Sequence, residues 1–160
     1  MSARPRRVAL WALGLVACAS APPAVLRTAA LPSPAWIRVG VDGTTIALHH
    51  PRGGSIAASL SCDAVDEDAP LDVLVNHLLL QLEAPIEHGR RRIVLDGREA
   101  IRAGIGVRLD GVAVELDLVV LKKDGCVVDA QLAAAPAALA ALRPDFDRFV
   151  AGISVARRHR

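Results

Sequence analysis

Stretches in which large apolar residues alternate with small or polar ones begin the folded part of the chain. Residues 36–41 alternate in this way, as a half-buried strand does, and residues 55–62 alternate again. Residues 44–49, with β-branched Thr44, Thr45 and Ile46, are expected to form the returning strand between them. The pair Asp42-Gly43, between the first two stretches, is a strong hairpin signal. The pattern therefore predicts three consecutive strands, the first two of which form a hairpin.

An Asp-Gly pair recurs three times in the second half of the chain, at residues 96–97, 110–111 and 124–125. Short type I′ turns require positive φ, which Asp and Gly tolerate, so each pair predicts a tight turn. The segments around these turns have the composition and alternation of strands. They predict an antiparallel meander of four strands, at residues 93–95, 99–109, 112–121 and 126–132.

Apolar residues at helical spacing predict two helices. Those in residues 70–83 form one broad apolar face, and Pro85 ends the segment. Residues 136–153 carry a second apolar stripe, in which Pro144 is expected to separate a short turn from a helix that starts near Asp145. Antiparallel strands with segregated helices indicate an α+β fold, mostly antiparallel β-sheet with one or two helices packed on it.

The first twenty residues are patterned as an export leader. An arginine-rich start is followed by the apolar run of residues 8–17 and then by small residues, which is the build of a secretory signal peptide. Leu15-Val16-Ala17-Cys18 resembles the lipobox of bacterial lipoproteins. The resemblance implies cleavage between Ala17 and Cys18, a diacylglyceryl thioether on Cys18 and an acyl chain on the new amino terminus. Two or three acyl chains together give a stable membrane anchor.

Two other interpretations of the leader stay open. In one, Cys18 stands by chance at the end of an ordinary signal peptide. In the other, residues 8–26, which carry no charge, form an uncleaved membrane helix, although Pro22-Pro23 would break it near its end. A lipoprotein would face the periplasm or the cell surface. The absence of an Asp directly after Cys18 favours the outer membrane, by resemblance to the sorting signal of enteric bacteria.

These assignments divide the chain into a signal peptide (1–17), a lipid-anchored linker rich in Pro and Ala (18–35), a folded domain (36–155) and a basic tail (156–160). The precursor has 19 Lys and Arg against 17 Asp and Glu. Three of the arginines lie in the signal peptide, so cleavage leaves 16 basic against 17 acidic side chains, a net charge of −1. With no net positive charge and only 2% aromatic residues, the chain is not expected to bind nucleic acid.

The cysteines beyond the leader are Cys62 and Cys126. Thiols of exported proteins tend to pair, and these two lie at the end of one predicted strand and at the start of another. We therefore expect a disulfide between them, with two buried free thiols as the alternative. The chain has no C-x-x-C, which argues against a thiol oxidoreductase.

The candidate chemical groups do not form a catalytic set in the sequence. His49 and His50 are adjacent on a strand and should point to opposite faces, which makes a poor metal-chelating pair. Gly53-Gly54-Ser55 is not a nucleophile elbow. The run 90–92, three arginines, either contacts anionic lipid or an acidic partner, or is a solvated loop that protects a strand edge. We therefore expect no metal, no catalytic residues and no cofactor beyond the lipid on Cys18.

Several segments of residues 36–155 carry a resemblance to a known family. They are the amino-terminal strand pair, GGSIAASLSCD, the helix after PLD, the LDGREA turn, VVLKKDGC and DFDRFVAGI. Together they are similar to the PsbP/Mog1-like superfamily and to small lipoproteins of proteobacteria. Because relatives of that fold bind or scaffold other proteins, the resemblance implies a non-enzymatic interaction or assembly module with an envelope protein as partner. The alternative is a small-ligand-binding domain or a hydrolase, with a site between sheet and helices.

Overall fold

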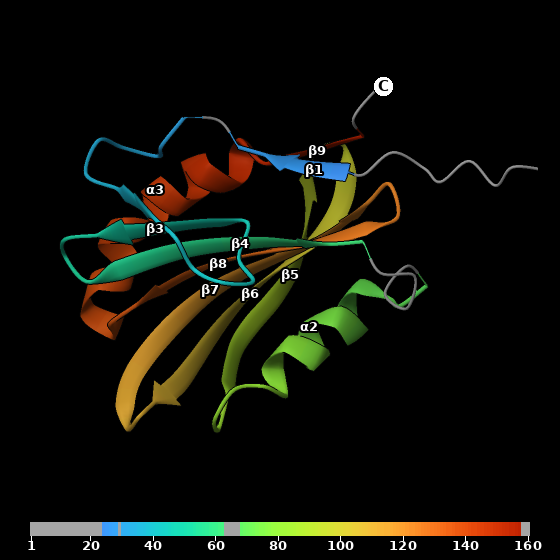
Figure 1. Cartoon of the computed structure of the whole chain (residues 1–160). Coiled ribbons are helices and arrows are strands. Elements are labelled where there is room, and N and C mark those ends of the chain that lie inside the picture. Colours follow the sequence, from blue (N-terminus) through green and yellow to red (C-terminus); the bar gives the residue numbers. More distant parts are fainter. Residues whose placement is uncertain (1–23, 29, 63–67, 158–160) are drawn as a thin grey trace, which may run out of the picture.

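The computed structural model describes residues 24–28, 30–62 and 68–157. Seven antiparallel strands form the main sheet, in the order β2-β3-β4-β8-β7-β6-β5, and β1 and β9 form a separate ribbon (Figure 1). The signal peptide, the cleavage site at Ala17 and the lipidation site at Cys18 lie outside the described residues. The strands are β1 (Ala24–Arg27), β2 (Ile37–Val39), β3 (Ile46–His50), β4 (Gly54–Ser61), β5 (Ile86–Leu95), β6 (Arg98–Leu109), β7 (Val112–Lys123), β8 (Cys126–Ala134) and β9 (Ser154–Arg157).

The meander predicted from the Asp-Gly pairs is confirmed. Strands β5 to β8 follow one another as antiparallel neighbours in the sheet. At each of the three turns both residues adopt positive φ, from 49° to 54° at the aspartates and from 72° to 80° at the glycines. This is the type I′ geometry that suits the right-handed twist of the flanking strands. The turn residues therefore set the register that brings specific side chains of β6, β7 and β8 together.

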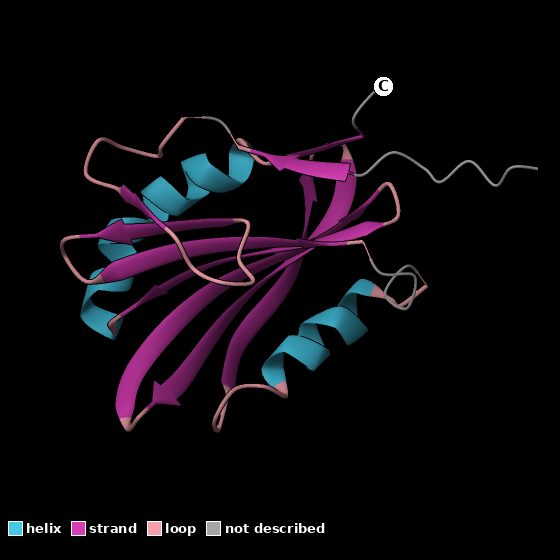
Figure 2. Cartoon of the chain, viewed as in Figure 1, coloured by secondary structure: helices cyan, strands magenta, loops and turns pink. Residues whose placement is uncertain are grey.

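A helix covers each face of the main sheet (Figure 2). Helix α3 (Pro136–Ala151) packs on β4, β7 and β8, and helix α2 (Leu71–Leu79) packs on β6 and β7 from the other side. Each helix has its own apolar core, and the α3 core, which contains Trp36 and Phe146, is the larger. Because both faces are covered, β7 is buried continuously from residue 116 to residue 121. The α+β class predicted from the sequence is confirmed.

Pro144 does not divide the last helix, as the sequence predicted it would. Helix α3 is continuous from Pro136 to Ala151 with Pro144 inside it. Pro144 and Ala140, whose carbonyl loses its partner to the proline, both lie on the exposed side, where water can bind that carbonyl. The apolar stripe on the opposite side of α3 stays buried on both sides of the proline, at Leu139, Leu142, Phe146, Phe149 and Val150. The burial of this stripe stabilises the helix by more than the roughly 3 kcal/mol that a proline in a helix interior costs.

The folded part begins before the predicted boundary at residue 36 and includes part of the predicted tail. Strand β1 pairs with β9, and each contributes a buried residue to the α3 core, Leu26 and Val155. The backbone N–H of Val155 also donates to the carboxylate of Asp96, over 2.9 Å. Residues 24–27 lie between the prolines of the predicted linker, so nothing in them prevents strand pairing. The largest differences among the other boundaries are at α2, which is shorter than residues 70–83, and at β5, which starts at residue 86 instead of 93.

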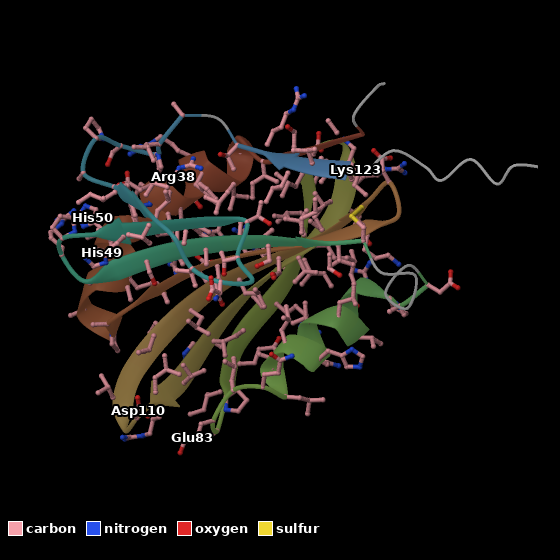
Figure 3. The ribbon with its side chains drawn as sticks, in the orientation of Figure 1. Arg38, His49, His50, Glu83, Asp110 and Lys123 are labelled. Atoms are coloured by element: carbon pink, nitrogen blue, oxygen red, sulfur yellow. A yellow bond between two sulfur atoms is a disulfide. The ribbon has the colours of Figure 1, made fainter. Side chains whose placement is uncertain are left out.

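Cys62 and Cys126 form a disulfide, with 4.1 Å between their Cα atoms. Strands β4 and β8 are neighbours, and the register that pairs Ser61 with Val127 brings the two cysteines together at their ends. The yellow bond lies near Lys123 in Figure 3. The pairing predicted from the sequence is the one that the structure contains. Neither described helix is long and apolar enough to cross a bilayer.

Candidate functional site: an arginine-lined cavity with a glycine floor

The two histidines point to opposite faces, as predicted. His50 is 4% exposed and packs against Trp36, with 5.0 Å between the ring centroids. Its Nδ1 accepts a hydrogen bond from the backbone N–H of Arg52. His49 is exposed and lies directly opposite Ser55 on β4. No described carboxylate is within hydrogen-bond or ion-pair reach of either histidine, so these residues do not form a triad.

The arginine run of residues 90–92 lies on strand β5 and not in a loop, which corrects the sequence interpretation. Alternation along the strand sends Arg90 and Arg92 toward α2, where both form ion pairs with Asp72 over 3.1 Å. Arg90 also pairs with Glu87 at 2.8 Å, and this contact, opposed by burial, raises the pKa of its guanidinium. Arg91 points to the other side of the sheet and makes no hydrogen bond or ion pair with the described residues.

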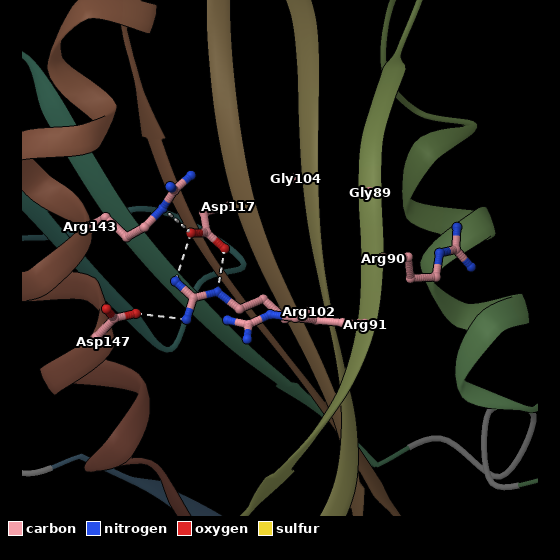
Figure 4. A pocket seen from close by; sticks show the side chains of 8 residues that line it. All are labelled: Gly89, Arg90, Arg91, Arg102, Gly104, Asp117, Arg143 and Asp147. Atoms are coloured by element: carbon pink, nitrogen blue, oxygen red, sulfur yellow. Dashed lines mark hydrogen bonds and ion pairs between the residues drawn. The ribbon is translucent and has the colours of Figure 1, made fainter.

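Arg91 borders a cavity that holds about 400 Å³. The cavity lies on the α3 side of the sheet, where β5, β6 and β7 extend past the helix (Figure 4). Strand residues and two residues of α3 line it: Gly89, Arg90, Arg91, Arg102, Gly104, Asp117, Arg143 and Asp147.

An ion-pair network forms one wall of the cavity. The carboxylate of Asp117, a residue 3% exposed, accepts hydrogen bonds of 2.7 Å from Nε and Nη2 of Arg102. It also accepts one of 3.0 Å from Nε of Arg143. Arg102 pairs in addition with Asp147 on α3 at 2.7 Å and lies over the Phe146 ring, 5.6 Å from its centroid. These contacts, first of all the hydrogen bonds to Asp117, raise the pKa of the Arg102 guanidinium.

The floor of the cavity carries no side chains, because Gly89 and Gly104 lie opposite each other on β5 and β6. Neither glycine has positive φ, so the backbone does not require glycine here. A Cβ atom built on Gly89 meets nothing within 4 Å, and one built on Gly104 meets only Cβ of His88, at 3.9 Å. Packing therefore does not require glycine either. Glycine inside a strand lowers stability and often marks a place where another group approaches the backbone.

The cavity has an excess of positive charge. Arg91, Arg102 and Arg143 face two carboxylates, and both carboxylates are already paired with arginine. Arg143 uses only its Nε in the contacts with described residues, and Arg91 uses none of its donors. These free N–H groups suit a carboxylate or phosphate group brought by a ligand.

The sequence pattern does not indicate this site. Arg102, Asp117, Arg143 and Asp147 come from three elements, and only the register of β6 against β7 places Asp117 opposite Gly104 and diagonal to Arg102. The signal in the sequence is a charged residue inside each of two apolar strands, Arg102 in β6 and Asp117 in β7. The described residues contain no group of three or more His, Cys, Asp or Glu side chains that could hold a metal ion.

No family model matches the chain, and no curated protein matches it. Solved structures similar to it include the following three. One is a protein of unknown function from Pseudomonas aeruginosa described as a putative regulator, with a TM-score of 0.54 and 18% identity over 89% of both chains. Cyanobacterial PsbP (CyanoP) from Synechocystis has a TM-score of 0.56 and 14% identity, over 90% of this chain and 99% of its own. LpqN of Mycobacterium tuberculosis, which is involved in cell envelope biogenesis, has a TM-score of 0.57 and 15% identity over 84% and 85%.

At these identities the likenesses show the fold alone. The resemblance to PsbP predicted from the sequence is confirmed at that level. The neighbours include LpqN, which is involved in cell envelope biogenesis, and a disulfide is typical of proteins outside the cytoplasm.

Proposed function

We propose that this protein is a lipid-anchored, non-enzymatic interaction module of the bacterial cell envelope. In this proposal Cys18 carries the lipid, the outer membrane is the favoured location, and the folded domain binds an envelope protein. The lipobox pattern, the disulfide and the PsbP-like fold support the location and the type of protein. The arginine-lined cavity is the proposed contact site, and an acidic group of the partner is its proposed ligand.

The ion-pair network is the observation that carries this proposal. A general base or a nucleophile needs a side chain that is free to react or to take a proton. The carboxylates that line this cavity are instead fixed by arginine, Asp117 by two guanidinium groups and Asp147 by one. The side chains left with free donors are arginines, which recognise anions but do not exchange protons at neutral pH. The geometry therefore supports recognition better than catalysis.

The proposed contact site is tested by capturing partners from cross-linked envelopes with the full chain. Arg91→Glu reverses the charge of the free arginine, and Gly104→Val fills the floor without requiring a strained backbone. Each variant should capture at least tenfold less of a partner protein than the wild type does. Arg38→Glu is the matched control, since Arg38 is an exposed arginine on β2, at the opposite edge of the sheet (Figure 3).

Each outcome of the capture experiment has a distinct meaning. A partner lost by both cavity variants and kept by Arg38→Glu supports the contact site. A partner kept by all variants contradicts this site but leaves an interaction module in place. If no protein is enriched over a mock preparation, the interaction function itself is wrong.

The anchor is tested separately by fractionating cells that express Cys18→Ala. The lipoprotein interpretation predicts that the wild type sediments with membranes and that the variant accumulates as an unprocessed or soluble precursor. Membrane association of the variant equal to that of the wild type would contradict lipidation at Cys18.

A further inference from the structure

A second cavity lies on the opposite face of the sheet, beneath α2. It holds about 240 Å³. Leu78 and Leu82 line it on the α2 side, and apolar residues of β6 and β7 line it on the sheet side. Four of its five polar lining residues lie on β4, on β8 and just before β3, and the fifth follows α2: Thr44, Ser59, Asp129, Gln131 and, after α2, Gln81. The cavity is therefore amphipathic, with an apolar part beside a polar part.

Among the described residues, Asp129 is the only ionisable one that lines this cavity. It lies in the middle of strand β8, paired with Ser59 on one side and with Val120 on the other. Its carboxyl group makes no hydrogen bond or ion pair with the described residues. Burial alone raises the pKa of this group, since no neighbouring charge or donor offsets it.

The carboxyl group is accessible from the cavity despite this burial. Among the described residues, no fully buried side-chain nitrogen or oxygen lacks a hydrogen-bond partner. Because Asp129 has no such partner, its oxygen atoms must reach the open space that the cavity provides. A ligand in the cavity can therefore contact the carboxylate directly.

The half-buried, unpaired carboxylate of Asp129 does not stabilise the fold. A half-buried carboxylate without a donor loses hydration and gains nothing in return, and an apolar residue at the same position in β8 would pack better. An ionisable group held in this way within a cavity is characteristic of a binding site. An ionised carboxylate only accepts hydrogen bonds, so the ligand group that suits it is a cation or a hydrogen-bond donor.

We propose that the cavity beneath α2 binds an alkylammonium group. Its ammonium end contacts the Asp129 carboxylate, with Ser59 and Gln131 beside it as further polar contacts. Its apolar chain lies against Leu78, Leu82 and the apolar residues of β6 and β7. Either a free amphipathic amine or the side chain of a lysine supplies this chemistry. The site is independent of the arginine-lined cavity, which lies on the other face of the sheet.

Binding is tested on the full chain in detergent at neutral pH, with four probes: hexylammonium, 1-hexanol, hexanoate and Nα-acetyl-lysine amide. Hexanol has the same apolar chain as hexylammonium without the charge, and hexanoate has the opposite charge. Chemical-shift changes at the backbone amides of Leu78 and Gln131 report the location of the bound probe. Hexylammonium should bind at least tenfold more tightly than hexanol, and hexanoate should not bind.

Two variants separate the contribution of the Asp129 charge from that of the cavity volume. Asp129→Asn keeps the shape of the side chain and should bring hexylammonium to the affinity of hexanol. Ala57→Leu fills the cavity from β4 and should abolish binding of both while leaving the carboxylate in place. Glu83→Gln removes an exposed carboxylate outside the cavity and should change nothing (Figure 3).

The probes also distinguish the two sources of the ammonium group. Binding of Nα-acetyl-lysine amide as tight as that of hexylammonium supports a lysine side chain, and much weaker binding supports a free amine. The proposal is overturned if neither amine shifts these amides at about 10 mM, or if Asp129→Asn binds hexylammonium as well as the wild type does.

Discussion

The two faces of the sheet each have an aspartate in the middle of a central strand. On the α3 face, Asp117 of β7 accepts three hydrogen bonds from two arginines and is 3% exposed. On the α2 face, Asp129 of β8 is less buried and accepts none from the described residues. The difference arises from the neighbours, because β6 and α3 bring Arg102 and Arg143 to Asp117 whereas α2 and its following turn bring leucines to Asp129. A carboxylate in a sheet is thus structural or available depending on what covers it.

The largest expected effect comes from removing the structural aspartate. Asp117→Ala leaves Arg102 in a half-buried site with only Asp147 as an acidic partner, so we expect a loss of about 3 kcal/mol in the free energy of unfolding. Urea denaturation measures it. The control is Asp147→Asn, at the exposed end of the same network, which should cost less than about 1 kcal/mol. Equal losses for the two variants would contradict the central role given to Asp117.

The disulfide should stabilise both faces alike. Cys62 and Cys126 join β4 to β8, and both strands contribute side chains to the two faces. Replacing both cysteines by alanine should lower the free energy of unfolding by about 2–4 kcal/mol. Amide hydrogen exchange should accelerate equally in α2 and α3. A change confined to one helix would show that the faces unfold separately, and a reductant should reproduce the loss in the wild type alone.

Two glycines provide a smaller contrast. A Cβ atom built on Gly54 lies 2.3 Å from Cδ1 of the buried Leu142, so Gly54→Ala should cost about 1–3 kcal/mol. Gly104→Ala, on the open cavity floor, should instead gain up to about 1 kcal/mol, because alanine loses less backbone entropy on folding. Thermal unfolding of the pair tests the prediction. A loss at Gly104 as large as that at Gly54 would mean that the floor is closed.

The smallest effect is expected from Asp129→Asn without ligand. Burial raises the pKa of Asp129 in the folded state above the ordinary value of 3.8, which holds in the unfolded state. At a pH between the pKa of the unfolded state and that of the folded state, the folded state therefore binds more protons. The contribution of this group to stability therefore falls as the pH rises through that range and stays unfavourable above it. Asp129→Asn should be slightly more stable than the wild type at pH 7 and should lack this part of the pH dependence. Urea unfolding from pH 3 to pH 7 tests it, and a less stable variant at pH 7 would contradict the unpaired state.

The sequence predicted the parts of the fold that depend on local chemistry. Asp-Gly pairs can be recognised as turns because few other residues tolerate their φ, and the order of the meander follows from them. The ribbon of β1 and β9 was missed because the partners are far apart in the chain and each has only four residues. The predicted break of the helix at Pro144 is wrong because the effect of a proline depends on which side of the helix faces solvent.

The candidate sites could not be predicted in the same way. Asp117 and Asp129 look alike in the sequence, each a single carboxylate between apolar strand residues. What distinguishes them is the element packed above each one, and this depends on long-range packing. Likewise, the arginine run resembles a solvated loop until the pairing of β5 with β6 sends its members to opposite faces.

The ribbon of β1 and β9 shortens the linker between the folded domain and the proposed lipid anchor. If Cys18 is lipidated, only five residues lie between it and Ala24, the first residue of β1. Fully extended, that distance is at most about 20 Å, far less than the linker predicted up to residue 35 would allow. The domain would then stay close to the headgroups, which restricts its partners to molecules that reach the membrane surface.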